Sequence, residues 1–317
     1  MNALAFLFPG QGSQAVGMGK ELADRYAIAR QTFEEADQAL GLKLSQLCFE
    51  GPEDQLRLTE NTQPAILTVS IAAWRVLQEK VGGLKPAFLA GHSLGEYSAH
   101  VVAGTISFAD AVRTVRNRGK YMQEAVPVGT GAMAAILGMN LDSVAAVCGD
   151  AAQSEICEPA NINSPEQIVI SGHAAAVERA VKLASARGAK RAILLPVSAP
   201  FHCSLMKPAQ ERLAQDLAKI DFAAPQFSVV ANVYATPVED AEGAREALTR
   251  QVTGSVKWSE SMQLLVAREV ETFIEIGPGK VLCGLMRQID RSKKCLNVED
   301  EGSLQKAAAY WTATQTA

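Results

Sequence analysis

The sequence lacks the features that mark membrane and nucleic-acid-binding proteins. No apolar run in its 317 residues is long enough to cross a bilayer, and the short apolar stretch at residues 4–8 has no basic leader that would make it a signal peptide. Charged residues make up 20% of the chain and the formal net charge is −4, which does not favour nucleic-acid binding. We therefore expect a soluble cytoplasmic protein that binds neither nucleic acid nor membrane.

Cysteine and histidine are both scarce. The six cysteines form no CxxC pair and have no metal-ligand spacing, which favours reduced thiols and no metal site. They are Cys48, Cys148, Cys157, Cys203, Cys283 and Cys295. With only four histidines in the chain, a general base has few candidates. The length allows one large core, with room for a second, small domain.

Strand-like and helical segments alternate along the first part of the chain. Strands are expected over residues 4–8 and 86–90, and helices over 17–41, 63–81 and 108–125. This alternation is typical of a parallel sheet with helices on both faces. The same pattern resumes near the end, with helices over 204–219 and 281–289 and strands over 227–233 and 271–276.

The segment between these parts has a different order. After a glycine-rich linker, strands are expected over 132–137, 155–161, 167–171 and 191–197, helices over 141–152 and 174–187, and a turn at Asn163-Ser164-Pro165. This β-α-β-β-α-β order is that of a split, ferredoxin-like unit. We therefore predict a large α/β domain from residues 1–127 and 198–317, with a small ferredoxin-like domain inserted at 128–197.

The most informative motif is Gly91-His92-Ser93-Leu94-Gly95, between an expected strand and an expected helix. A Gly-X-Ser-X-Gly in that context makes a sharp turn that lifts the serine hydroxyl out of the sheet. The start of the following helix offers unpaired N–H groups to a developing oxyanion. Chance matches to so short a pattern occur, so the motif alone makes Ser93 a candidate nucleophile and no more.

A serine nucleophile needs a base, and His202 is the best placed of the histidines. His92 adjoins the serine, and neighbours in a tight turn point apart, while His100 lies in the following helix and His173 in the small domain. His202 lies in an apolar loop where the chain re-enters the large domain, and such a loop can reach a neighbouring strand end. The adjacent Cys203 is interpreted as a small buried hydrophobe.

Arg118 is the second informative residue. It falls on the apolar face of its helix, three residues after Val115, whereas Arg116 points away. A guanidinium near a core requires a carboxylate partner or a polar cavity. Two interpretations stay open on the residues alone: an internal salt bridge or snorkelling side chain, and a bidentate clamp on an anionic substrate.

The loop Phe8-Pro9-Gly10-Gln11-Gly12-Ser13-Gln14 follows the first expected strand. With Ala15 it formally resembles a dinucleotide-binding fingerprint, but Pro9 stiffens the turn and the acidic residues about 20 positions on lie in a helical stretch. Exposed N–H groups beside the serine serve an oxyanion hole equally well.

Together these pieces resemble the malonyl-CoA:acyl carrier protein transacylase family. Besides the two loops above, the matching motifs, in the family's order, are Arg118-Gly119-Lys120, Gly131-Ala132-Met133-Ala134-Ala135, Asn161-Ile162-Asn163-Ser164-Pro165, Pro200-Phe201-His202 and Ile276-Gly277-Pro278-Gly279-Lys280. The family is known for a ferredoxin-like subdomain in an α/β-hydrolase-like core.

The resemblance implies a role for each matching residue. Ser93 would be the nucleophile, His202 its base, and the main-chain carbonyl of Gln251 the group that orients the histidine. The backbone N–H groups of Gln11 and Leu94 would form the oxyanion hole.

The resemblance also implies a substrate pocket. Arg118 would bind the malonyl carboxylate, and Phe201 looks like the malonyl-selecting residue, although many stand-alone bacterial members carry serine there. Asn163 would line the pocket, unless it is only a turn residue, and His92 would support the site.

Further expectations follow from the resemblance. Malonyl-CoA and an acidic acyl carrier protein would be the partners, no cofactor would be needed, and the chain would act as a monomer. The compact single chain, without fused synthase modules, favours fatty acid over polyketide synthesis. Basic residues would receive the carrier protein, for which the weak candidates are Lys190, Arg191, Lys280 and Arg287.

Three rival functions stay open. A serine esterase or thioesterase of the α/β-hydrolase type would use water as acceptor and tolerate neutral acyl groups, against which Arg118 argues. An NAD-dependent oxidoreductase rests only on the imperfect glycine loop. A non-enzymatic carrier-protein-binding subunit would form no acyl-serine.

Overall fold

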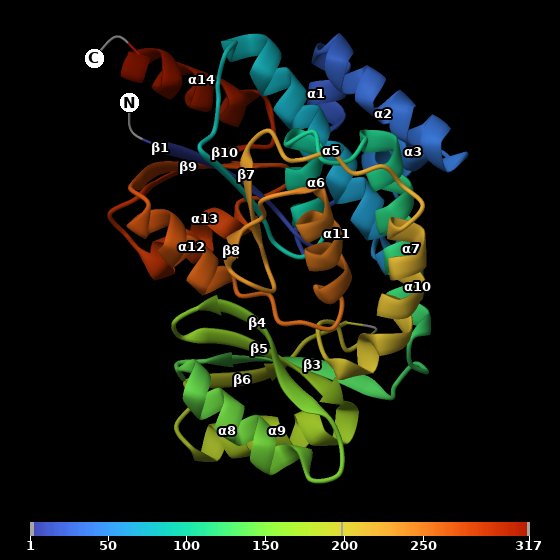
Figure 1. Ribbon diagram of the computed structural model, residues 1–317, viewed down its shortest axis with the longest axis vertical. Coiled ribbons are helices and arrows are strands. Elements are labelled where there is room, and N and C mark those ends of the chain that lie inside the picture. The colour runs from blue at the N-terminus through green and yellow to red at the C-terminus, as the bar shows by residue number, and fades with distance from the viewer. Residues whose placement is uncertain (1–2, 198, 316–317) are drawn as a thin grey trace.

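The computed structural model describes residues 3–197 and 199–315, which build two β-sheets (Figure 1). The larger sheet lies in the upper part of the molecule among most of the helices, and the smaller one lies below it with two helices on its outer face (Figure 1). Ser198, at the predicted domain boundary, lies outside the described residues.

The elements alternate as a mixed α/β chain. The strands are β1 (Ala3–Phe8), β2 (Phe88–Gly91), β3 (Gly131–Leu137), β4 (Cys157–Ser164), β5 (Gln167–His173), β6 (Arg191–Leu194), β7 (Ser228–Ala231), β8 (Thr236–Pro237), β9 (Val270–Ile276) and β10 (Lys294–Val298). The helices are α1 (Lys20–Arg25), α2 (Ala27–Leu40), α3 (Leu44–Glu50), α4 (Glu53–Leu56), α5 (Thr59–Val81), α6 (Gly95–Val102), α7 (Phe108–Glu124), α8 (Leu141–Ala152), α9 (Ala174–Ala186), the short 3₁₀ turn η1 (Ser204–Met206), α10 (Lys207–Leu217), α11 (Ala241–Arg250), α12 (Trp258–Ala267), α13 (Val281–Ile289) and α14 (Glu301–Gln315).

The larger sheet has the strand order β10-β9-β1-β2-β7-β8, and all its pairings are parallel except that of β8 with β7. Alternate residues of β1 enter two different hydrophobic clusters: Phe6 and Phe8 join the one that includes α5, and Ala5 and Leu7 the one that includes α12. Both faces of the strand are therefore buried, which explains its continuous apolar run. The predicted parallel sheet covered on both faces is confirmed.

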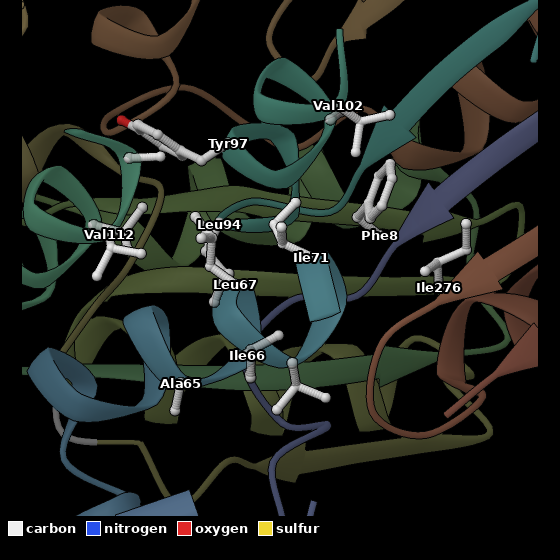
Figure 2. Close-up of a cluster of buried hydrophobic side chains, with 14 of the residues drawn as sticks. Phe8, Ala65, Ile66, Leu67, Ile71, Leu94, Tyr97, Val102, Val112 and Ile276 are labelled. Carbon is white, nitrogen blue, oxygen red and sulfur yellow. The ribbon is translucent and has the colours of Figure 1, made fainter. Parts of the chain in front are cut away.

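The core on the α5 side supports the serine motif. Leu94, at the start of α6, and Tyr97 lie in the same buried cluster as Leu67 and Ile71 of α5 (Figure 2). All four side chains are almost completely buried. The helix that follows Ser93 is thus anchored through its apolar residues, which keeps the turn before it rigid.

The smaller sheet has the order β4-β5-β3-β6, and every pair in it is antiparallel. Helices α8 and α9 cover it, and their apolar residues form a separate cluster with the strands. At its free edge, β4 contacts the larger part of the molecule, where the backbone N–H of Val256 donates to Ala160 (2.8 Å) and its carbonyl accepts from Ile162 (2.9 Å). This contact fixes β4 beside the segment that leads into α12.

The sequence-based expectations of one long helix over 17–41 and of free thiols throughout were wrong. The single helix over 17–41 is two helices, because Tyr26 between them is extended, with φ −118° and ψ 122°. Thiols were expected throughout, but Cys283 of α13 and Cys295 of β10 form a disulfide with a Cα–Cα distance of 5.5 Å. The two cysteines are 12 positions apart in the sequence, and they meet because α13 packs beside β10. Cys48, Cys148, Cys157 and Cys203 are free and buried.

No helix in the described part of the chain combines the length and the apolar character needed to span a bilayer.

Candidate active site

Ser93 stands at a tight turn between β2 and α6. Its φ is +52°, a left-handed conformation that non-glycine residues rarely adopt. A Cβ at Gly91 would collide with the backbone of Gly95, and one at Gly95 would collide with the carbonyl oxygen of Phe8. The two glycines of the motif are therefore required by close backbone approach, and the strained serine is held in place by its surroundings.

The hydroxyl of Ser93 lies 2.7 Å from Nε2 of His202. The other ring nitrogen, Nδ1, lies 2.9 Å from the backbone carbonyl oxygen of Gln251. A carbonyl can only accept a hydrogen bond, so Nδ1 must carry the proton and donate it. Nε2 is then the acceptor for the serine hydroxyl, which is the tautomer that a general base requires.

His202 is buried, and its protonation state follows from that. Burial, reinforced by the nearby positive charge of Arg118, lowers the pKa of His202 to about 3. The imidazole is therefore neutral in the resting protein at physiological pH, and it is ready to accept a proton. The thiol of the neighbouring Cys203 donates to the Pro200 carbonyl, and burial raises the pKa of Cys203 to about 11, so it stays protonated.

Arg118 is buried on α7 with only 2% of its surface exposed, and every hydrogen-bond partner recorded for it is neutral. Its Nη1 donates to Oε1 of Gln63 (2.7 Å), and its Nη2 donates to Oε1 of Gln251 (2.8 Å) and to Oγ of Ser93 (3.0 Å). No carboxylate among residues 3–197 and 199–315 lies within 4.0 Å of the guanidinium. The salt-bridge interpretation is wrong: within the described residues, no carboxylate contacts the buried guanidinium directly, and it lies against the serine hydroxyl.

A cavity of about 190 Å³ opens over this cluster. Ser93, His202 and Arg118 line it with Gln11, Gln63, His92, Leu94, Met122, Met133, Asn161, Asn163, Val169, Leu195, Val197 and Phe201. Strands β3, β4 and β5 of the smaller sheet contribute to it, together with helices α5 and α7 and the loops after β1 and β2, so the cavity lies between the two parts of the molecule. Its walls combine an apolar side with amide, imidazole and guanidinium groups.

The two residues predicted for the oxyanion hole lie together at this cavity. The loop after β1 approaches the serine turn so closely that a Cβ at Gly10 would lie 2.6 Å from the carbonyl oxygen of His92. Within the described residues, the backbone N–H groups of Gln11 and Leu94 have no hydrogen-bond acceptor. The glycine loop precedes a helix that begins only at Lys20, whereas a dinucleotide fingerprint leads directly into its helix.

Comparison with known proteins places the chain in a family. Residues 5–309 match the acyl transferase domain. The chain is 54% identical over 289 residues to the malonyl CoA-acyl carrier protein transacylase of Salmonella typhimurium. The matched region covers 91% of this chain and 93% of that protein. The chain belongs to this transacylase family. The resemblance first suggested by the motifs is confirmed.

Other members of the transacylase family are also similar to this chain over nearly its whole length. The protein of that name from Bacillus subtilis is 50% identical over 308 residues, covering 97% of this chain and 96% of the relative. The solved structure of the Coxiella burnetii enzyme has a TM-score of 0.95 and 44% identity, covering 97% of both chains. A structure described as a type II PKS acyl-carrier protein in complex with its malonyl-transacylase has a TM-score of 0.95 and 49% identity, covering 97% of this chain and 99% of that one.

Two further predicted residues of this transacylase-family chain form a pair on the cavity wall. Nε2 of His92 lies 2.9 Å from Oδ1 of Asn163, and burial lowers the pKa of His92. Asn163 belongs to strand β4, which runs to Ser164, so the turn predicted at Asn163-Ser164-Pro165 is wrong; the turn is at Pro165 and Glu166. Phe201, also predicted, lies on the apolar side of the cavity.

Sequence reasoning missed three polar residues of the site in this family member. Gln63 of α5 binds Arg118. Asn232, just after β7, accepts a hydrogen bond from the backbone N–H of Ser93 at 2.7 Å, and Glu96 accepts one from the backbone N–H of Asn232 at 2.9 Å. Glu96 directly follows the serine motif, and a carboxylate so close to the candidate nucleophile was the available signal. No sequence signal pointed to Gln63 or Asn232, because only the packing of distant segments brings these two residues to the site.

His100 of α6 gives a stability prediction. It is fully buried, neither ring nitrogen has a hydrogen-bond partner in the described part of the chain, and burial lowers its pKa to about 3. Its Nε2 lies 4.0 Å from Oε1 of Glu96, which is not an ion pair while the imidazole is neutral. Below its ordinary pKa near 6.5, the unfolded chain binds a proton that the folded chain does not, so the free energy of unfolding falls as pH falls from about 6.5 towards 3.

Replacing His100 by methionine removes this dependence. We expect the wild-type protein to lose roughly 1 kcal/mol of unfolding free energy per pH unit relative to His100→Met between about pH 6 and pH 4. Denaturant unfolding of both proteins at several pH values measures this difference. If the unfolding free energies of the two proteins change equally with pH over this range, the prediction is contradicted.

Proposed function

We propose that this protein moves the malonyl group from malonyl-CoA to the phosphopantetheine thiol of an acyl carrier protein, through a malonyl-serine intermediate. The observation that carries the proposal is the buried Arg118 guanidinium, which lies 3.0 Å from the Ser93 hydroxyl with no carboxylate partner among the described residues. An acyl group with a carboxylate at its far end supplies the missing negative charge. The names of the relatives, including one in complex with a carrier protein, support the same reaction.

The first half-reaction acylates the serine. Nε2 of His202, 2.7 Å from Ser93 Oγ, takes the hydroxyl proton as the oxygen attacks the thioester carbonyl. The backbone N–H groups of Gln11 and Leu94 stabilise the oxyanion. When the C–S bond breaks, the sulfur of CoA takes the proton from His202 and CoA leaves.

The second half-reaction reverses these steps with another thiol. The phosphopantetheine thiol gives its proton to His202 and attacks the malonyl-serine carbonyl. The C–O bond to Ser93 breaks, and the serine oxygen recovers the proton. The carbonyl of Gln251 stabilises the imidazolium form in both half-reactions through Nδ1, as the third member of a serine triad does.

The remaining cavity residues select the acyl group. Arg118 pairs with the malonyl carboxylate, and Phe201 limits the space beside the carbon between the two carbonyls. Asn163 and His92, bonded to each other at 2.9 Å, form the polar wall contributed by β4 and the serine turn.

We extend the proposal to the domain organisation. The order β4-β5-β3-β6 with two covering helices supports a ferredoxin-like unit at 128–197, inserted into an α/β-hydrolase-like domain formed by 1–127 and 198–317. The chain would work as a cytoplasmic monomer without a cofactor, in fatty acid synthesis.

Intact-mass measurement tests the function. Purified protein is mixed with malonyl-CoA, with acetyl-CoA in a parallel sample, and a holo acyl carrier protein is then added. We expect a malonyl adduct on the protein that disappears as the carrier protein gains the same mass, and a much weaker acetyl adduct. Release of free malonate without any adduct on the carrier protein would instead identify a hydrolase.

A further inference from the structure

Glu96 is a fully buried carboxylate that does not line the cavity, yet every hydrogen bond recorded for it leads back to the site. It is the second residue of α6, directly after the serine turn. Its Oε2 accepts two hydrogen bonds, from the backbone N–H of Asn232 at 2.9 Å and from Nε2 of Gln251 at 2.8 Å. Both donors belong to residues that contact Ser93.

The bond to Gln251 determines which way its amide faces. A carboxylate oxygen can only accept, so the NH₂ end of the amide must point at Glu96. The carbonyl end, Oε1, then faces Arg118 and accepts from Nη2 at 2.8 Å. With the amide reversed, an NH₂ group would face the guanidinium, donor against donor. The same NH₂ group also donates to the carbonyl oxygen of Ser93 at 2.9 Å.

The bond to Asn232 holds the other side of the serine. Glu96 fixes the Asn232 backbone, and the Asn232 side chain then accepts from the Ser93 N–H at 2.7 Å and donates to the Gly91 carbonyl at 2.7 Å. The N–H and the carbonyl of Ser93 are therefore both bound by groups that Glu96 anchors. This matters because the left-handed backbone of Ser93 is strained and must be held by its neighbours.

Stability alone does not account for a carboxylate at this position. Its second oxygen, Oε1, has no hydrogen-bond partner in the part of the chain that the structure describes. Burial raises the pKa of Glu96 to about 7, against the lowering effect of its two hydrogen bonds and of Arg118. A buried, half-satisfied carboxyl group is destabilising relative to a well-packed apolar side chain. Its benefit must lie in the geometry that it imposes.

We propose that Glu96 is a positioning residue for acyl transfer: it orients the Gln251 amide that aims Arg118, and with Asn232 it anchors the backbone of Ser93. The proposal rests on the proposed function for its substrate, but its geometry concerns this chain alone. Glu96 acts on two groups with different tasks, because Ser93 attacks any acyl donor, whereas Arg118 recognises only an acyl group that carries a carboxylate.

The test compares Glu96→Ala with Glu96→Gln. Glutamine keeps an acceptor oxygen for both donors, so we expect its rate of Ser93 acylation to stay within about threefold of wild type. Alanine removes the acceptor, and misplacement of reacting groups by about 1 Å costs on the order of 10²-fold. For Glu96→Ala we expect acylation by malonyl-CoA to slow by about 10²-fold and the malonyl-to-acetyl rate ratio to fall by about tenfold.

Glu275 of β9 provides a matched control. Like Glu96, it is a fully buried carboxylate whose pKa is raised by burial to about 7, and it accepts hydrogen bonds from the backbone N–H groups of Leu282 and Cys283. It lies outside the cavity lining. Glu275→Ala should lower the thermal midpoint as Glu96→Ala does, without changing the malonyl-to-acetyl ratio. If Glu96→Ala behaves like this control, with an unchanged ratio, the proposal is overturned.

A neutral reagent separates this proposal from the function on which it rests. Phenylmethylsulfonyl fluoride sulfonylates an activated serine and carries no carboxylate for Arg118 to recognise. Its labelling rate therefore depends on how well Ser93 is positioned and activated. We expect Glu96→Ala to slow this labelling and Glu96→Gln to leave it near the wild-type rate. If wild-type protein forms no malonyl adduct, the proposed function fails, and this labelling still decides the role of Glu96: equal rates in wild type and Glu96→Ala overturn it.

Discussion

Replacing Ser93 by alanine should abolish the malonyl adduct and lower malonyl transfer by at least about 10³-fold. The reason is geometric as well as chemical. The hydroxyl lies 2.7 Å from a neutral imidazole acceptor and at the edge of the cavity, and without its oxygen no covalent intermediate can form. Intact-mass spectra after incubation with malonyl-CoA, together with initial rates of transfer to the carrier protein, measure both effects.

Ser98 is the matched control for this prediction. It is buried on α6, the helix that follows Ser93, and its hydroxyl has no hydrogen-bond partner among the described residues. Ser98→Ala should keep the full adduct and nearly the full rate, since it removes a hydroxyl that nothing binds. An adduct that persists in Ser93→Ala would show that another residue is the nucleophile.

Replacing Arg118 by alanine should change which acyl group the protein accepts. Loss of a buried, charge-assisted pairing with the malonyl carboxylate costs about 3 kcal/mol, or about 10²-fold in malonyl acylation. Acetyl-CoA has no carboxylate, so its slow reaction should fall far less. The ratio of malonyl to acetyl acylation, from the rate of adduct formation with each thioester, measures the effect.

Arg118→Lys should recover little of this activity. A lysine cannot bind Gln63 and Gln251 while also presenting a planar fork to a carboxylate. The control is Arg113→Ala on the same helix, where the arginine is exposed and paired with Asp110 at 2.9 Å; it should leave the ratio unchanged. A parallel loss with both thioesters in Arg118→Ala would contradict a role in recognising the acyl carboxylate.

These two residues were predictable because local sequence signals single them out. A serine between glycines, after an apolar run and before a helix, needs only the local backbone to be recognised. Arg118 stood out because a charged side chain fell on a helix face that is otherwise apolar, and that face is indeed buried from Phe108 to Met122. Strand β1 was predicted for a similar reason: its continuous apolar run matches a strand covered on both faces.

His202 was predicted as the base by elimination among the histidines. With only four histidines in the chain, its place in an apolar loop was enough to select it, and the structure brings it within 2.7 Å of Ser93. The tautomer could not be foreseen from the loop, because it depends on the Gln251 carbonyl at the end of a distant helix. The motif resemblance had indicated Gln251 for this role, and the packing of the chain brings its carbonyl oxygen to 2.9 Å from Nδ1 of His202.

The sequence by itself determined the alternating α/β architecture, the serine turn and the family, since these depend on local patterning and on motifs in order. Tertiary structure alone decided how the polar groups around Ser93 are paired. Glu96, Gln251, Asn232 and Gln63 come from four separate segments, and no periodicity records which buried donor meets which acceptor. Tertiary structure also decided that no carboxylate in the described part of the chain contacts Arg118 and that Cys283 meets Cys295. A buried polar group must find its partner wherever the fold brings one, and that depends on the whole chain.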